Sequence, residues 1–165
     1  MEAHLVKHNL PPLYDASSRV LILGTMPSPK SREAQFYYAH PQNRFWKLLS
    51  CVFSEYPPAI NEERRMFLQR HHIALWDVLR SCEIEGADDA SIRKPEANDL
   101  SLILKTANIQ KIFTTGAKAY ALYEKLCRPG IKMEACPLPS PSPANCRYSF
   151  EYLLEQYRQI ARFTE

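Results

Sequence analysis

Aromatic, amide and imidazole side chains gather in one short stretch of the chain, residues 24–46. The stretch reads GTMPSPKSREAQFYYAHPQNRFW and sets His40 and Asn43 among several aromatic rings. Aromatic rings stack on the faces of a planar heterocycle, while amide and imidazole groups hydrogen-bond with its edges. The stretch therefore indicates a pocket for a planar base, and it favours Tyr37 and Tyr38 as part of the pocket wall.

The same aromatic stretch has a structural alternative. Phe45 and Trp46 begin a run with helical apolar spacing, which favours packing of these two rings in the core.

His71 and His72 stand together at a predicted helix end without a third metal ligand nearby, so a solvated face is the better interpretation.

Two further groups follow apolar runs. Asp77 ends the run IALWD, where a lone carboxylate is either a catalytic group or a turn and cap residue. Thr114, Thr115 and Gly116 follow IQKIF, and they either cap the next helix or offer amides to a phosphate; capping is favoured.

Prolines and serines alternate between residues 139 and 145, in the sequence PSPSPAN. Such a loop is stiff, so it can press against a sugar–phosphate backbone or enter a base stack at low entropic cost. The alternative is an ordinary connection between a strand and a helix, with Asn145 as the helix cap.

The elements that must position these groups follow from apolar patterning. Strands are predicted at 19–24, 73–78, 109–115 and 131–138, and helices at 43–52, 61–70, 98–107, 116–127 and 148–160, with Asn98 as one cap and Arg128–Pro129–Gly130 ending the fourth helix. The polar segment 81–95 is predicted to be a surface loop. Strands that alternate with helices predict an α/β fold, a three-layer sandwich with a central four-stranded, mostly parallel sheet flanked by helices. Ligands bind at the carboxyl ends of strands in such sheets, where the candidate groups lie.

Length and composition narrow the function classes. The 165 residues suit a single domain spanning 1–165, and 45% hydrophobic and 24% charged residues argue against disorder. The four glycines are too far apart for a dinucleotide fingerprint or a Walker loop.

Apolar runs are too short for a membrane span, and the first residues do not resemble a signal peptide, so a cytoplasmic location is expected. The net charge of +3 is compatible with nucleic acid without requiring it. The five cysteines form no CxxC pair, so reduced thiols and no metal site are expected.

Four motifs, taken in order, resemble one known family. GTMPS, FYYAHPQNRFWKLL, IALWDVLRSCE and LPSPSPAN are similar to motifs of the hypoxanthine-DNA (deoxyinosine) glycosylases, a branch of the uracil-DNA glycosylase superfamily. The resemblance spans nearly the whole chain, and it implies the same four-stranded sandwich. It also implies a cofactor-free, monomeric enzyme that flips a deaminated base out of DNA and hydrolyses its N-glycosidic bond.

The resemblance assigns roles to particular residues. Many relatives carry Asp or Asn two positions after the motif's glycine to hold water, whereas this chain has Met26, so Asn43 is expected to position the water instead. Asp77 is expected to contact the base edge or tune the site. Tyr38 or Phe36 would stack on the base. The expected base pocket consists of Gly24, Thr25, Met26, Pro27, Ser28, Phe36, Tyr38, His40 and Thr115, and the expected DNA contacts are Ser140, Pro141, Ser142, Pro143, Ala144, Asn145 and Arg147.

Two alternatives stay open at this point. In the first alternative the protein is still a DNA glycosylase, but it removes a different base, namely uracil, xanthine or a mismatched pyrimidine. Met26 counts against efficient uracil removal. A catalytically silent module that binds damaged DNA would keep the same aromatic pocket. Thr115 stands where relatives often have Asn, which makes the mode of base recognition a further open point.

Overall fold

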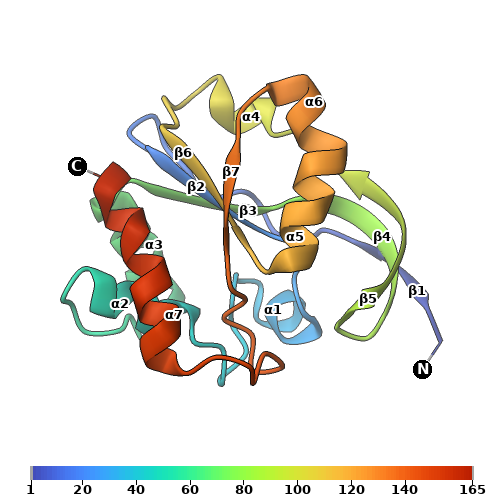
Figure 1. Cartoon of the computed structure of the whole chain (residues 1–165), viewed down its shortest axis with the longest axis horizontal. Helices are drawn as coiled ribbons and strands as arrows, with labels where there is room; N and C mark the ends of the chain where they lie inside the picture. The colour runs from blue at the N-terminus through green and yellow to red at the C-terminus, as the bar shows by residue number, and fades with distance from the viewer. Residues whose placement is uncertain (1, 165) are drawn as a thin grey trace.

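A four-stranded parallel sheet forms the centre of the molecule. The computed structural model describes residues 2–164, so residues 1 and 165 of the expected domain lie outside the described residues. The strands lie in the order β3 (Ile73–Asp77), β2 (Val20–Gly24), β6 (Lys111–Thr115) and β7 (Ala135–Leu138), and neighbouring strands run parallel (Figure 1). Every residue of β2 and β3 is buried. Continuous apolar runs of this kind are typical of a sheet covered on both faces.

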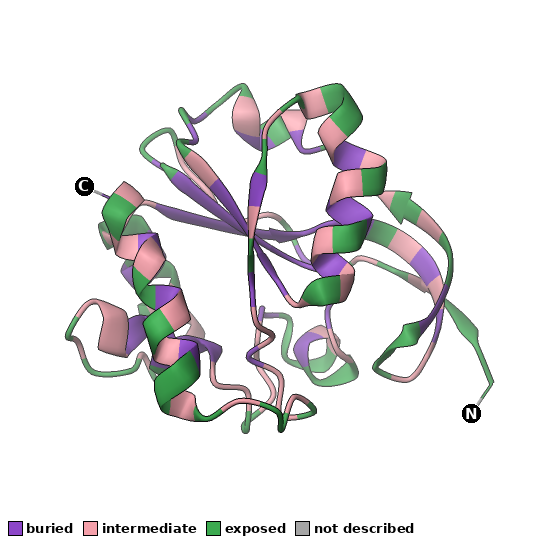
Figure 2. Cartoon of the chain, in the orientation of Figure 1, coloured by how far each residue is buried: buried purple, intermediate pink, exposed green. Residues whose placement is uncertain are grey.

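Helices cover both faces of this sheet, which confirms the predicted three-layer α/β fold. On one side lie α2 (Phe45–Val52), α3 (Asn61–Arg70) and α7 (Phe150–Tyr157); on the other lie α5 (Ala117–Leu122) and α6 (Arg128–Ile131) (Figure 1). The remaining helical segments are α1 (Pro29–Ala34), α4 (Ser101–Leu104), the π-helical turn η1 (Tyr123–Cys127) and the 3-10 segment η2 (Arg158–Phe163). Burial is concentrated in the sheet and in the helix faces turned toward it (Figure 2).

A second sheet was missed by the sequence prediction. The segment 81–95, expected to be a surface loop, belongs to a hairpin of β4 (Leu79–Glu85) and β5 (Asp88–Ala97), and β1 (His4–Lys7) pairs antiparallel with β4. The prediction was wrong because this sheet has one largely solvated face, so charged side chains dominate the segment. Cys82 and Ile84 are buried at a spacing of two, which is the strand signal in this polar sequence.

Two predicted helix boundaries were also wrong. The chain stays helical through Pro129. The helix α6 ends at Ile131, and the residue that follows, Lys132, adopts a left-handed conformation. Proline is tolerated there because it lies in the first turn of α6, where its missing N–H has no helical acceptor. Asn98 caps no helix; its side-chain amide donates to the backbone oxygens of Asp77 and Leu79 instead. Among residues 2–164, no helix has the length and apolar character needed to cross a membrane.

One arginine fixes the loop between β7 and α7. The Arg44 guanidinium donates to the carbonyl oxygens of Ser142 at 3.0 Å, Asn145 at 2.7 Å and Tyr148 at 3.2 Å, with a longer contact to Pro141. The backbone N–H of Arg44 donates to the same Pro141 oxygen at 3.0 Å. Asn145 also closes the loop, because its amide donates to a carbonyl within it. The loop is therefore organised around a charge from a distant segment rather than by its prolines alone.

We expect Arg44→Lys to destabilise the fold. Lysine keeps the charge but loses the planar fork that reaches several carbonyls at once, and each lost hydrogen bond to a charged group costs about 1.5–3 kcal/mol. Urea denaturation should show that the free energy of unfolding of Arg44→Lys is about 2–3 kcal/mol lower than that of the wild type.

The matched control for this prediction is Arg147→Lys, an exposed arginine of the same loop, expected to change stability by less than about 0.5 kcal/mol. Equal stability of the two variants would contradict the role given to Arg44.

Candidate functional site

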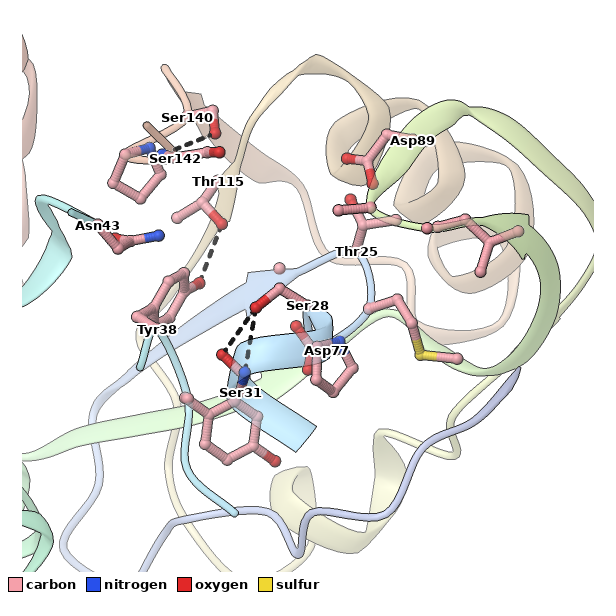
Figure 3. A pocket seen from close by; sticks show the side chains of 18 residues that line it. Thr25, Ser28, Ser31, Tyr38, Asn43, Asp77, Asp89, Thr115, Ser140 and Ser142 are labelled. Atoms are coloured by element: carbon pink, nitrogen blue, oxygen red, sulfur yellow. Dashed lines mark hydrogen bonds between the residues drawn. The ribbon is translucent and has the colours of Figure 1, made fainter. Parts of the chain in front are cut away.

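A pocket opens at the carboxyl ends of the parallel strands, as the fold class predicts (Figure 3). Its volume is about 140 Å³, and because a cavity of about 150 Å³ accepts benzene, it has room for a planar ring. The lining residues are Gly24, Thr25, Met26, Pro27, Ser28, Ser31, Tyr37, Tyr38, Asn43, Asp77, Ile84, Gly86, Ala87, Asp89, Thr115, Ser140, Pro141 and Ser142. Most of the residues predicted from sequence for the base pocket are thus brought to one place.

Phe36 and His40 are the exceptions among the predicted pocket residues, and both lie outside its lining. Phe36 is buried in the core at 2% exposure and contacts Trp46, with ring centroids 6.0 Å apart. The backbone turns on both sides of Phe36, because Gln35 and Tyr38 both have positive φ. His40 is a turn residue: its Nδ1 accepts the N–H of Gln42 at 3.1 Å.

The loop residues predicted to contact DNA divide into two groups. Ser140, Pro141 and Ser142 line the pocket, whereas Pro143, Ala144, Asn145 and Arg147 lie farther along the loop and outside the lining. Asn145 does not cap α7, because Ser149 does so by accepting the N–H of Tyr152.

Gly24 lies at the centre of three polar atoms from three other segments. A Cβ placed on Gly24 would lie 2.5 Å from Asp77 Oδ1, 3.3 Å from the Tyr38 hydroxyl and 3.5 Å from Thr115 Oγ1. Only a residue without a side chain leaves this space open. The three atoms therefore surround one point on the pocket floor and form a compact array of hydrogen-bonding groups.

Asp77 is almost completely buried, and its two carboxylate oxygens have different surroundings. Oδ2 is 2.8 Å from Nε2 of His8, and the side chains of the two residues are only 6% and 3% exposed. Oδ1 lies beside Gly24 and has no hydrogen-bond partner among residues 2–164. His8 follows β1, so the second sheet brings to the site a residue that lies 69 positions away in sequence. No spacing pattern pointed to it.

The Tyr38 and Thr115 hydroxyls form a hydrogen-bonded pair, with their oxygens 3.0 Å apart. The Tyr38 ring stacks on Phe45, with ring centroids 3.8 Å apart and an angle of 12° between the planes. Burial, together with the negative charge of Asp77, raises the pKa of Tyr38, so its hydroxyl stays protonated. One hydroxyl proton serves the pair, and the other is available to a ligand.

Asn43 presents a donor to the pocket rather than an acceptor. Its Oδ1 accepts the backbone N–H of Phe45 at 2.9 Å, at the start of α2, and this bond assigns the orientation of the amide. The NH₂ group then points toward the pocket and toward Thr115 (Figure 3). This geometry allows Asn43 to hold a water molecule through the oxygen atom of that water, while the amide oxygen is turned toward the Phe45 N–H.

The hairpin of β4 and β5 supplies the wall that the sequence prediction left out. Ile84, Gly86, Ala87 and Asp89 line the pocket from this hairpin. Asp89 is exposed overall, but partial desolvation of its carboxyl beside the pocket raises the pKa; the nearby charge of Asp77 adds to the effect, while a hydrogen bond from the Thr25 hydroxyl opposes it. The alternation of buried residues in β4 was the signal that could have revealed this wall.

Polar side chains at the pocket do not form a metal centre. Among the described residues, no group of three or more His, Cys, Asp or Glu side chains is arranged to hold a metal ion. Ser28 has a structural task at the pocket edge, because its hydroxyl accepts the N–H of Ser31 at 3.2 Å and caps α1. His71 hydrogen-bonds with Glu55.

Comparison with known proteins identifies several relatives. The model of the uracil DNA glycosylase superfamily matches residues 11–161. A hypoxanthine DNA glycosylase from Methanosarcina barkeri is 35% identical over 142 residues, which cover 86% of this chain and 89% of the relative. Another from Methanosarcina acetivorans is 33% identical over 146 residues, covering 88% and 92%.

A solved structure shares the same architecture. The solution NMR structure of a candidate uracil DNA glycosylase from Methanosarcina acetivorans superposes with a TM-score of 0.79 at 31% identity, over 95% of this chain and 99% of the other. The match over residues 11–161 includes all of the pocket lining and all four strands of the parallel sheet. The chain belongs to the uracil DNA glycosylase superfamily.

Proposed function

We propose that this protein is a DNA glycosylase that excises hypoxanthine from DNA by hydrolysing the N-glycosidic bond of deoxyinosine. The observation that carries the proposal is the array around Gly24, where a free carboxylate oxygen lies beside two hydroxyl groups. The names of the two Methanosarcina relatives support the same substrate. Neither a metal ion nor a protein partner is needed for the steps proposed below, and we expect the protein to act as a monomer.

The array is complementary to the edge that deamination creates. Hypoxanthine carries a carbonyl oxygen, O6, next to a protonated ring nitrogen, N1. In the proposed complex Asp77 Oδ1 accepts the N1–H, and the free proton of the Tyr38–Thr115 pair is donated to O6. Adenine has an unprotonated N1 and an amino group at these positions, so it would place a lone pair against the carboxylate.

Cleavage of the glycosidic bond separates charge. The sugar gains oxocarbenium character while the electron pair of the bond leaves with the base. The hydroxyl donor at O6 stabilises the negative charge that spreads onto this oxygen, and it is oriented before the reaction begins. A water molecule then adds to C1′ of the sugar and loses a proton to solvent.

Asn43 is proposed to hold that water through its free NH₂ group. The Asn43 NH₂ group donates to one lone pair of the water and leaves the other lone pair free to attack C1′ of the sugar. Asn43 therefore acts by positioning the water and not as a base. Such assistance is sufficient because an oxocarbenium ion is a strong electrophile.

DNA contacts are proposed for the loop at the pocket edge. Ser140 to Asn145 would press the backbone on one side of the flipped nucleotide, and Arg147 would contact a phosphate. The rigid attachment of the loop through Arg44 supports this role. DNA affinity should accordingly fall as salt rises.

Substitution of Asn43 separates positioning from base catalysis. Asn43→Asp keeps the acceptor for the Phe45 N–H and replaces the free NH₂ with an oxygen, whereas Asn43→Ala removes both groups. Both variants should lose about 100-fold or more in the single-turnover rate on an inosine duplex. The Ala variant should keep most of its affinity for that duplex.

Two outcomes would contradict this proposal. A rate for Asn43→Asp equal to or above that of the wild type would mean that residue 43 acts as an acceptor or base. A wild-type protein that binds the inosine duplex tightly and never cleaves it would be the silent binding module.

A methyl group at Gly24 should block the array. Because Asp77 is held by His8, its oxygen cannot retreat freely from a Cβ placed 2.5 Å away. We expect Gly24→Ala to lower inosine excision by about 10- to 100-fold, as for a misplaced substrate, with the fold retained by circular dichroism. Gly130→Ala is the matched control, since its Cβ would meet nothing within 4 Å. Unchanged excision by Gly24→Ala would remove the array from the proposed mechanism.

A further inference from the structure

The hydrogen bond between His8 and Asp77 is held in a defined geometry by the surrounding chain. The backbone N–H of His8 donates to the carbonyl oxygen of Arg80 at 2.7 Å, which anchors the residue to the start of β4. The imidazole ring lies near Tyr37 and Trp76, with ring centroids at 6.0 and 6.3 Å. These contacts leave the ring little freedom to turn.

The same contacts fix the position of the proton on the ring. The backbone N–H of Leu10 donates to Nδ1 of His8 at 3.3 Å, so Nδ1 must offer its lone pair. The proton of the neutral ring is therefore on Nε2, and this N–H donates to Asp77 Oδ2 at 2.8 Å. His8 can act toward Asp77 only as a donor.

A fixed donor on one side determines what the other side of residue 77 presents. The atom next to His8 must be an acceptor, and for a carboxylate this leaves a second acceptor, Oδ1, beside Gly24 on the pocket floor. An amide at position 77 would place its oxygen against His8 and its NH₂ group in the pocket. The polarity of the pocket floor thus depends on both residues.

We propose that His8 is a specificity-determining residue: by donating to Oδ2 it holds Asp77 with the acceptor Oδ1 at the pocket floor, which selects bases with a protonated ring nitrogen next to a carbonyl. The inference rests on the proposed function for its substrate. Hypoxanthine, xanthine and uracil all have this N–H, as do guanine and thymine, whereas adenine and cytosine have a lone pair there, so the acceptor excludes adenine and cytosine. His8 touches no substrate in this account and acts only through Asp77.

A swapped pair tests the inference. Asp77→Asn should turn a donor toward the pocket and reduce inosine excision by about 100-fold or more, because a buried donor then faces the base N–H. His8→Glu should also be impaired, since it sets two carboxylates against each other. The double variant His8→Glu/Asp77→Asn keeps the net charge of the pair. The carboxylate at position 8 accepts the amide NH₂, and the amide oxygen returns to the pocket.

The double variant should regain at least about tenfold in single-turnover rate over either single variant, a recovery that a purely structural role of His8 would not give. The ratio of the equilibrium affinities for inosine- and adenosine-containing oligonucleotides should follow the same order, because the donor of Asp77→Asn opposes the N1–H of hypoxanthine and suits the lone pair of adenine. Circular dichroism and thermal melting would establish whether each variant is folded. If the double variant is unfolded, His8→Gln/Asp77→Asn replaces it, because glutamine can turn its carbonyl toward the amide.

The outcomes distinguish the inference from the proposed function. A folded double variant no better than Asp77→Asn, in both rate and affinity, overturns the role of His8. A wild-type protein that excises nothing while the affinities follow the predicted order would refute the glycosylase function and support the specificity role.

Discussion

One buried carboxylate constrains the whole site. Asp77 lies at the carboxyl end of β3 with its side chain 6% exposed, and burial of a charge at this depth is costly unless it is hydrogen-bonded. The hydrogen bond comes from His8, which reaches Asp77 only because β1 pairs with β4, the strand that directly follows. The carboxylate in turn excludes any side chain at position 24. The second sheet, the N-terminal strand and the glycine of β2 are therefore parts of one arrangement.

The pocket combines groups of opposite hydrogen-bonding character from separate elements. Asp77 supplies an acceptor, the pair of Tyr38 and Thr115 supplies a donor, and the Asn43 amide supplies another donor at the opposite side. None of these groups is a strong base at the place where water would attack. We therefore propose that the site accelerates the reaction by orienting the water and by stabilising charge. The base leaves with the electron pair of the broken bond.

Sequence patterns predicted the sheet and most of the pocket because both depend on local signals. Fully apolar runs such as Val20–Leu23 mark buried parallel strands, and the residues after them necessarily meet at one edge. The hairpin at 79–97 was missed because its outer face carries charges. Phe36 was misplaced because the sequence does not show the backbone turns at Gln35 and Tyr38, between which its ring packs into the core. His8 was beyond prediction, since it meets Asp77 through strand pairing and no motif connects the two.

The most direct test of the central claim is alkali-induced strand scission of labelled DNA duplexes that each carry a single inosine, xanthine, uracil or unmodified adenine. A pocket floor that offers an acceptor to a protonated ring nitrogen predicts scission at inosine and none at adenine, and it is compatible with scission at xanthine and uracil. Scission at adenine comparable to that at inosine, or no scission at any base, would contradict the account.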